Sequence, residues 1–324
     1  MPGNDVTMAR ILSIALNPTI DISCDAERVE PIHKIRTRNQ QQYAGGGGTN
    51  VARVIAELGG APDLLYLAGG ASGRLFSHFM EACSIRCHRF DIGADIRIAL
   101  MVHEEATGLE YRFVPEGPVI GVDELEPALA FVEKSDADYV VASGSLPMGV
   151  PVDTYARMAD AVQGRGARFV LDTSGEALRV TLARSRVFLF KPSLGELQKL
   201  VGRELQGDDV TLAAMEFVRS GAARNVAVTM GRDGAVLVNE DGILRLPPIT
   251  VDVRSAVGAG DSFTGAMIWS LSQGYPIADA FRFGSAAGAA AVMTAGTELC
   301  RRRDVFELFE STRNDLSSAP VAGP

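Results

Sequence analysis

The sequence has little cysteine and no long apolar run. Its four cysteines are too few and too scattered over 324 residues for a disulfide framework. Cys83, Cys87 and His88 lie close together in the chain, but no second ligand pair accompanies them, so packing explains them better than a metal site. No apolar run reaches the roughly 18 residues of a membrane span, and the opening stretch MPGNDVTMARILSIAL merges into NPTIDIS without a signal-peptide cleavage site. We therefore expect a cytoplasmic protein without a membrane partner.

Positive charge is also scarce. The chain has 31 Lys and Arg against 40 Asp and Glu, and this net charge of −9 argues against nucleic acid as a partner. If the ligand is a phosphate, local cations must hold it. Two familiar nucleotide motifs are absent as well: no G-x-x-x-x-G-K-[ST] occurs, and Phe263 stands where a dinucleotide fingerprint that starts at Gly258 needs its third glycine.

The stretch SAVGAGDSFTGAM, residues 255–267, places Gly258 and Gly260 directly before Asp261. Glycines leave backbone N–H groups unshielded, and the first N–H groups of a helix have no partner within it, so this pattern favours an anion site over a tight turn into a buried helix. A carboxylate beside a bound anion is useful if it takes a proton from a group that attacks that anion. A second cluster, Gly45 to Gly48, precedes another helical pattern, so the sequence indicates two anionic groups.

The pattern along the chain predicts an α/β protein. Short apolar runs such as DYVVASG, RFVLDTS, RVFLFKP and NVAVTMG alternate with helical segments, as strands buried on both faces of a parallel sheet do. Residues 21–43 and 92–114 instead alternate apolar and polar residues, with a turn at 106–108, and we expect them to form a small β-sheet lid outside the main layers. The predicted core includes Leu58, Leu67, Val140 and Val170.

YAGGGGTNVARVIAELGG and AVGAGDSFTGAM resemble, in order and spacing, the two signatures of the ribokinase-like (PfkB) sugar kinase family. Further similar segments include YRFVPEG, SGSLPMGVP, DTSGEAL, KPSLGEL, VTMGRDGA and GTELC, over roughly residues 10–310. The resemblance implies a three-layer α/β/α fold with a mostly parallel central sheet, one kinase domain over residues 9–312, flexible termini at 1–8 and 313–324, and a homodimer formed through the lid.

Within the family the chain is most similar to the ribokinase-like type of bacterial 6-phosphofructokinase, because Gly47 stands where fructose-1-phosphate and tagatose-6-phosphate kinases typically have lysine. The implied reaction transfers the γ-phosphoryl group of ATP, with Mg²⁺, to the C1 hydroxyl of fructose 6-phosphate. A tagatose-6-phosphate or fructose-1-phosphate kinase is the alternative enzyme. A non-catalytic sugar-phosphate or nucleotide sensor is the alternative of another class, which the intact Asp261 and both glycine loops disfavour.

The resemblance also implies roles for individual residues. Asp261 would be the general base, with the N–H groups of Gly258, Ala259 and Gly260 as the anion hole. The residues implied for the sugar phosphate are Asp21, Lys34, Gly45, Gly46, Gly47, Asn50, Arg97 and Ser145, with Arg36 as a helper.

The nucleotide side of the resemblance contains one departure. Lys191 would approach the nucleotide phosphates, and Thr229, Gly231 and Gly234 would form the loop beneath the nucleotide. The family usually has Asn-x-x-Glu where this chain has Ser193 and Glu196, so that the magnesium role of Glu196 is expected but weakened by the serine. The family also makes K⁺ a candidate cofactor.

Overall fold

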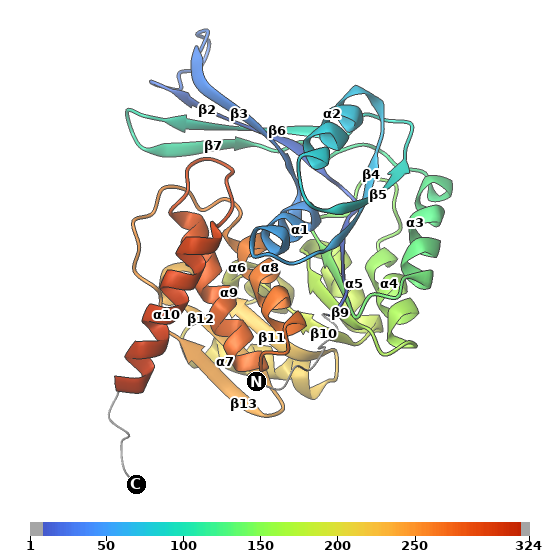
Figure 1. Ribbon diagram of the computed structural model, residues 1–324, viewed down its shortest axis with the longest axis vertical. Helices are drawn as coiled ribbons and strands as arrows, with labels where there is room; N and C mark the ends of the chain where they lie inside the picture. The colour runs from blue at the N-terminus through green and yellow to red at the C-terminus, as the bar shows by residue number, and fades with distance from the viewer. Residues whose placement is uncertain (1–8, 319–324) are drawn as a thin grey trace.

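The computed structural model describes residues 9–318, with side chains to residue 312, and its centre is a nine-stranded sheet (Figure 1). The strands are β1 (Ile11–Ala15), β4 (Asp63–Ala68), β5 (Arg86–Asp91), β8 (Tyr139–Ser143), β9 (Arg168–Asp172), β10 (Val187–Phe190), β11 (Ala223–Thr229), β12 (Ala235–Asn239) and β13 (Gly242–Leu246). Their order is β13-β12-β11-β10-β9-β8-β1-β4-β5, and all run in the same direction except β12, which is antiparallel to both of its neighbours, β11 and β13. The four quoted apolar runs form β8 to β11, which confirms the predicted parallel sheet.

Helices cover both faces of this sheet. They are α1 (Gly47–Glu57), α2 (Gly70–Glu81), α3 (Val122–Lys134), α4 (Thr154–Gln163), α5 (Gly175–Arg184), α6 (Leu194–Val201), α7 (Asp208–Arg219), α8 (Ala259–Ser272), α9 (Ile277–Val292) and α10 (Arg302–Ser318), with a 3₁₀ turn at Gly231–Asp233. Side chains of α1, α8 and α9 form the core on one face, and those of α2 to α7 form it on the other. This is the predicted three-layer, ribokinase-like architecture.

The predicted core residues are all fully buried. Leu58, Leu67, Val140 and Val170 each have 0% of their surface exposed. Because both faces of the central strands are covered by helices, these strands need no polar face, which explains their continuous apolar sequence. Helix α8 is buried along almost its whole length between α1 and α9, which explains the uncharged run after Asp261.

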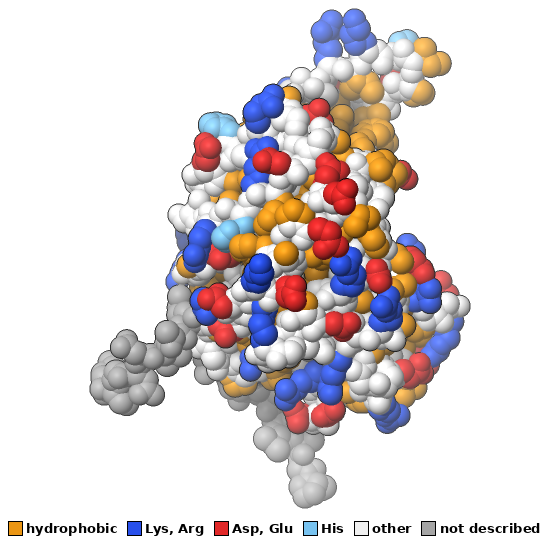
Figure 2. All heavy atoms as spheres, turned by 90° about the vertical axis from the view of Figure 1, so that its right-hand side faces the viewer, with side chains coloured by type: hydrophobic (Ala, Val, Ile, Leu, Met, Phe, Trp, Pro, Cys, Tyr) orange, Lys and Arg blue, Asp and Glu red, His pale blue; other side chains and the backbone are white. Residues whose placement is uncertain are grey.

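A second sheet forms the lid. Its strands are β2 (Thr19–Ala26), β3 (Thr37–Gly45), β6 (Arg97–Glu104) and β7 (Leu109–Phe113), in the order β3-β2-β6-β7. β2 runs parallel to β6 and antiparallel to β3, and the turn between β6 and β7 lies at the predicted position. The exposed loop 27–36 joins β2 to β3 at the end of the lid that projects from the body (Figures 1 and 2).

The last helix runs beyond the predicted end of the domain. Helix α10 continues to Ser318, six residues past the predicted end of the domain at residue 312. The other terminal residues for which flexibility was predicted, 1–8 and 319–324, lie outside the described part of the chain. Within residues 9–318, none of the helices is both long and apolar enough to cross a membrane.

Candidate functional site

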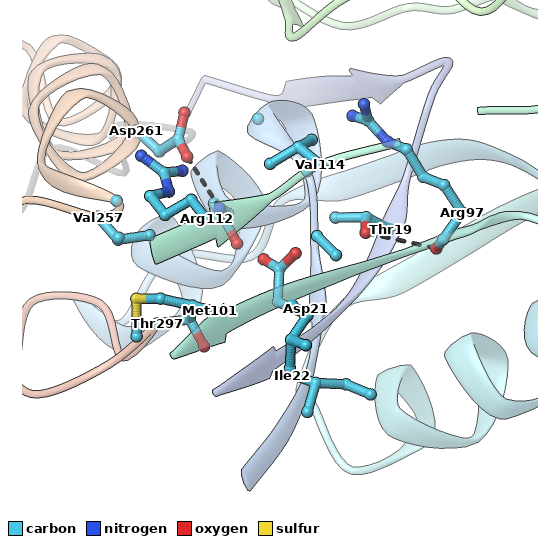
Figure 3. Close-up of a pocket in the computed structure, with 16 residues that line it drawn as sticks. Thr19, Asp21, Ile22, Arg97, Met101, Arg112, Val114, Val257, Asp261 and Thr297 are labelled. Carbon is cyan, nitrogen blue, oxygen red and sulfur yellow. Dashed lines mark hydrogen bonds between the residues drawn. The ribbon is translucent and has the colours of Figure 1, made fainter. Parts of the chain in front are cut away.

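A cavity of about 170 Å³ lies where the lid meets the first turns of α1 and α8 (Figure 3). β2, β6 and β7 form its lid side, and the two glycine-to-helix junctions form its other side. The predicted site residues that line it are Asp21, Gly46, Gly47, Asn50, Arg97, Gly258 and Asp261. Segments more than 200 residues apart in the sequence therefore build one pocket, as the resemblance implied.

Asp261 lies in the first turn of α8, at the positive end of the helix dipole. The helix begins after Gly258, whose φ of 75° is in the left-handed region that favours glycine. The side-chain amide of Asn50, from the first turn of α1, donates a hydrogen bond of 2.8 Å to Oδ2 of Asp261. The carboxylate is thus held beside unpaired helix N–H groups, which fits a proton acceptor next to an anion.

The pKa of Asp261 is raised to about 7, mainly by burial and then by the nearby carboxylates of Asp172 and Asp21. Asn50 and Lys191 oppose this rise. A carboxylate with a pKa near neutrality can both accept and hold a proton at physiological pH. Structural roles for acids rarely need such a shift, so this environment supports a general base.

Asp21 points into the same cavity from β2, beside two arginines of the lid (Figure 3). Burial raises the pKa of Asp21 above its ordinary value, and the charges of Arg53, Arg97 and Arg112 counteract that rise. Arg97 donates hydrogen bonds of 3.0 and 3.2 Å to the carbonyl oxygens of residues 17 and 115, which fix its guanidinium at the cavity wall. The cavity thus offers an acceptor for hydroxyl groups next to two cations, Arg97 and Arg112, for a phosphate.

A buried ion pair lies behind the anion hole. The ammonium of Lys191 is 3.3 Å from Oδ1 of Asp172, and the hydroxyl of Thr264 donates a 2.7 Å hydrogen bond to Oδ2 of the same carboxylate. A Cβ atom built on Gly260 would lie 3.4 Å from the Lys191 Nζ, so this ammonium is next to the helix N-terminus. Lys191 is therefore next to the glycines predicted as the anion hole, and its role toward nucleotide phosphates stays a prediction.

The remaining residues predicted for the nucleotide gather at the ends of β10 and β11. Ser193 forms an isolated parallel bridge with Thr229. Gly231 begins the 3₁₀ turn that follows, and Gly234 is the residue directly after it. Oε2 of Glu196 accepts hydrogen bonds of 2.8 Å from both the N–H and the hydroxyl of Ser193, which caps α6. Among the residues the structure describes, no three His, Cys, Asp or Glu side chains gather to hold a metal ion, so Glu196 would have to bind Mg²⁺ together with substrate oxygens.

Three of the eight residues predicted to bind the sugar phosphate do not line the cavity. Gly45 is adjacent to it, packed against the Asp21 carboxylate, and the Ser145 hydroxyl accepts a 3.2 Å hydrogen bond from Asn17. Lys34 is different, because it lies with Arg36 on the exposed loop 27–36. One copy of the chain therefore does not bring Lys34 to the site.

Sequence reasoning missed Arg112, Asp172, Thr264 and Arg53. The sequence did contain a signal for two of them: Asp172 lies at the end of the strand pattern RFVLDTS, and Arg112 lies in the family-like segment YRFVPEG. Thr264 and Arg53 gave no signal, since each looks like an ordinary helical residue and only tertiary contacts reveal its partner.

Comparison with known proteins agrees with this geometry. The model of the pfkB family of carbohydrate kinases matches residues 8–303. The ATP-dependent 6-phosphofructokinase isozyme 2 of Escherichia coli (strain K12) is 38% identical over 306 residues, which cover 93% of this chain and 98% of the relative. A 1-phosphofructokinase from Rhodobacter capsulatus is 32% identical over 297 residues, which cover 90% of this chain and 92% of that protein.

Among solved structures, that of phosphofructokinase-2 from Escherichia coli in complex with potassium superposes with a TM-score of 0.90. It is 37% identical, and the match covers 94% of this chain and 100% of that one. The family match spans most of the chain, and most of the predicted catalytic and sugar-binding residues line one cavity. The chain therefore belongs to the pfkB family of carbohydrate kinases and is a phosphofructokinase-type phosphotransferase with an alcohol group as acceptor.

Proposed function

We propose that this enzyme phosphorylates the C1 hydroxyl of fructose 6-phosphate with ATP and gives fructose 1,6-bisphosphate, the glycolytic reaction. The observation that carries the proposal is the position of Asp261, a carboxylate of raised pKa at the N-terminus of α8 that shares one cavity with Asp21 and Arg97. The 38% identity to a 6-phosphofructokinase supports the choice of sugar. The cytoplasm is the compartment we propose for it.

In this proposal Asp21 accepts hydrogen bonds from the sugar hydroxyls, and the side-chain amide of Asn50 donates one to them. Arg97 and Arg112 hold the 6-phosphate. Asp261 accepts the proton of the C1 hydroxyl as its oxygen forms a bond to the γ-phosphorus. The bond from that phosphorus to the bridging oxygen breaks at the same centre, and ADP leaves with the electron pair. The N–H groups at residues 258–260 stabilise the charge on the transferred group.

The nucleotide would lie along Lys191, Thr229 and the 3₁₀ turn, with its phosphates near the Lys191 ammonium. Oxygen ligands suit Mg²⁺, and Glu196 would hold it through water together with phosphate oxygens, because Oε1 takes no part in the cap of α6. The ion would neutralise charge on the phosphates. K⁺ stays a candidate cofactor on the strength of the potassium complex of the E. coli relative.

A homodimer through the lid is also part of the proposal. Strand alternation turns Asp21, Arg97 and Arg112 toward the body, so the opposite face of the lid carries Ile98, Phe113 and their neighbours. These two side chains are 45% and 56% exposed, although an outer sheet face in water is normally polar. A second copy of the lid would cover them. The projecting loop with Lys34 would then reach the partner, and we propose that Lys34 binds the sugar phosphate there.

A panel of kcat/KM values over fructose 6-phosphate, tagatose 6-phosphate, fructose 1-phosphate and unphosphorylated hexoses tests the substrate. Fructose 6-phosphate should give the highest value. The second candidate is a 1-phosphofructokinase, favoured by the 32% identical relative, and a higher kcat/KM for fructose 1-phosphate would replace our assignment with it. Absence of ADP release with every sugar would instead indicate a sensor.

A further inference from the structure

Arg53 is a partly buried cation on α1. It follows Asn50 by three positions, nearly one turn of the helix, and the charge of Asp21 acts on it although no ion pair of Arg53 occurs among the described side chains. Its Nη1 donates a hydrogen bond of 2.9 Å to the carbonyl oxygen of Ala44, and its guanidinium carbon is 5.4 Å from the centre of the Tyr43 ring. Burying a charge with so little compensation destabilises a fold, so a role in the site would explain its position.

The backbone that Arg53 contacts is the segment on which Asp21 rests. Tyr43 is the β3 partner of Asp21 on β2, and Gly45 follows Ala44. A Cβ atom on Gly45 would lie 1.9 Å from Oδ2 of Asp21, which shows how closely this backbone packs on the carboxylate. A shift of the Ala44 carbonyl would therefore move the backbone of Gly45, against which the Asp21 carboxylate packs.

The positive charge of Arg53 also lowers the pKa of Asp21, although Arg53 does not line the cavity. The charged groups around the Asp21 carboxylate are Arg53, Arg97 and Arg112, which favour its ionised form, and Asp261, which opposes it. Among these arginines the effect of Arg53 on the pKa of Asp21 is the largest. Arg97 and Arg112 line the cavity, so a bound phosphate would neutralise them, whereas Arg53 lies behind it and would keep its charge.

We propose that Arg53 is a positioning residue for sugar binding, which holds the backbone at Ala44 and places its positive charge near Asp21, whose carboxylate accepts hydrogen bonds from the sugar. This inference deepens the proposed function and rests on it. Helix α1 would then contribute two residues to sugar binding: Asn50 in the cavity and Arg53 behind the backbone that supports Asp21.

Two substitutions separate charge from packing. Arg53→Met removes the charge and keeps a long side chain, and Arg53→Lys keeps the charge. Both should fit, because Arg53 also borders a second cavity of about 600 Å³. Since Asp261 titrates near neutrality and would mask Asp21, both are made in an Asp261→Asn background. The dissociation constant of fructose 6-phosphate is then measured by calorimetry from about pH 5 to about pH 9.

We expect Arg53→Met to weaken binding of fructose 6-phosphate about tenfold at neutral pH, as loss of an outer partner of a ligand-binding group does, with ATP affinity unchanged. The midpoint of its pH dependence should move to higher pH, and Arg53→Lys should restore it. Arg303→Met is the matched control, because Arg303 pairs only with Glu307 on the surface of α10. The phosphate of the ligand titrates equally in all variants.

An unchanged midpoint and affinity in folded Arg53→Met would overturn the inference. A loss of affinity with an unchanged midpoint would reduce Arg53 to a backbone support and refute its electrostatic role. If the substrate panel identifies another sugar phosphate, that ligand replaces fructose 6-phosphate in the same titration. Failure of the substrate assignment is thereby distinguished from failure of the role of Arg53.

Discussion

Asn50 and Asp261 join the two glycine-to-helix junctions of the chain through the 2.8 Å hydrogen bond from Nδ2 to Oδ2. The bond fixes one oxygen of the carboxylate and leaves Oδ1 for the proton of a substrate. It also opposes the effect of burial on the pKa of Asp261, because a donor favours the ionised form. One contact thus couples the sugar side of the pocket, on α1, to the phosphoryl-transfer side, on α8.

Replacing Asp261 by asparagine should remove most of the activity and little of the binding. The base acts mainly in the transition state, so kcat should fall by about 10²–10⁴-fold while the KM for each substrate changes little. The nearly isosteric amide can still lie beside Asn50. Steady-state kinetics of Asp261→Asn measure this, and turnover within about threefold of the parent would contradict the assignment of the base.

The same variant should be more stable than the parent in alkaline buffer. The folded pKa of Asp261, about 7, exceeds its unfolded value of 3.8, so the folded state binds more protons between these values and loses stability as pH rises through that window. The neutral amide of the variant would escape this cost. We expect the free energy of unfolding of Asp261→Asn to exceed that of the parent by roughly 1–3 kcal/mol at about pH 8 and to match it near about pH 4. Denaturant titrations at both pH values test the sign.

Asp172 should set the pH at which the enzyme becomes active. Protonated Asp261 cannot accept a proton, so kcat/KM should rise with pH and level off above about pH 7. Because the charge of Asp172 raises the pKa of Asp261, Asp172→Asn should move this acid limb to lower pH. The substitution also frees Lys191 from its ion pair with Asp172, and the positive charge of Lys191 lowers the pKa of Asp261 as well. Asp63→Asn is the control, because Asp63 pairs with Arg86 where β4 and β5 begin, away from the site. This substitution should leave the acid limb of the pH profile unchanged.

Much of the fold and of the pocket could be predicted from local patterns. Strands β8 to β11 are apolar because helices cover both of their faces, and Gly258 indicates a helix start because its backbone conformation favours glycine. Arg53 and Thr264 could not be found this way, because their partners lie elsewhere in the chain and leave no periodic trace. The place of Lys34 escaped for a different reason, since it lies on an exposed loop that projects from the body, and the sequence pattern does not show where such a loop lies relative to the site.

Ser193 and Glu196 allow capping to be separated from metal binding. Ser193→Asn and Glu196→Gln both retain groups that can cap α6, so each should fold with nearly parental stability. If Glu196 holds Mg²⁺ through Oε1, Glu196→Gln should raise the Mg²⁺ concentration for half-maximal activity strongly, and Ser193→Asn only slightly. Ser193→Ala is the control: it should lose about 1 kcal/mol of stability without a large Mg²⁺ effect. Similar Mg²⁺ dependence in all variants would place the metal elsewhere.

The position of Lys34 predicts complementation between two defective subunits, measured at a fructose 6-phosphate concentration well below the KM of the Lys34→Ala variant. Lys34→Ala should raise the KM for fructose 6-phosphate far more than that for ATP, since it removes a charge-assisted hydrogen bond of about 1.5–3 kcal/mol. If Lys34 acts across the dimer, a heterodimer of Lys34→Ala with Asp261→Asn contains one site with both residues intact. Such a heterodimer, isolated with two affinity tags, should show about half of the parental activity, one site of two.

The matched control is the heterodimer of Asp21→Asn with Asp261→Asn. Both residues line the cavity of the same chain, so each of its sites lacks one of them and activity should stay at the level of the single variants. Recovery in the Lys34 pair alone would show that the loop 27–36 serves the partner. No recovery in either pair would mean that Lys34 acts within its own chain or not at all, and a normal KM in the Lys34→Ala homodimer would decide for the latter.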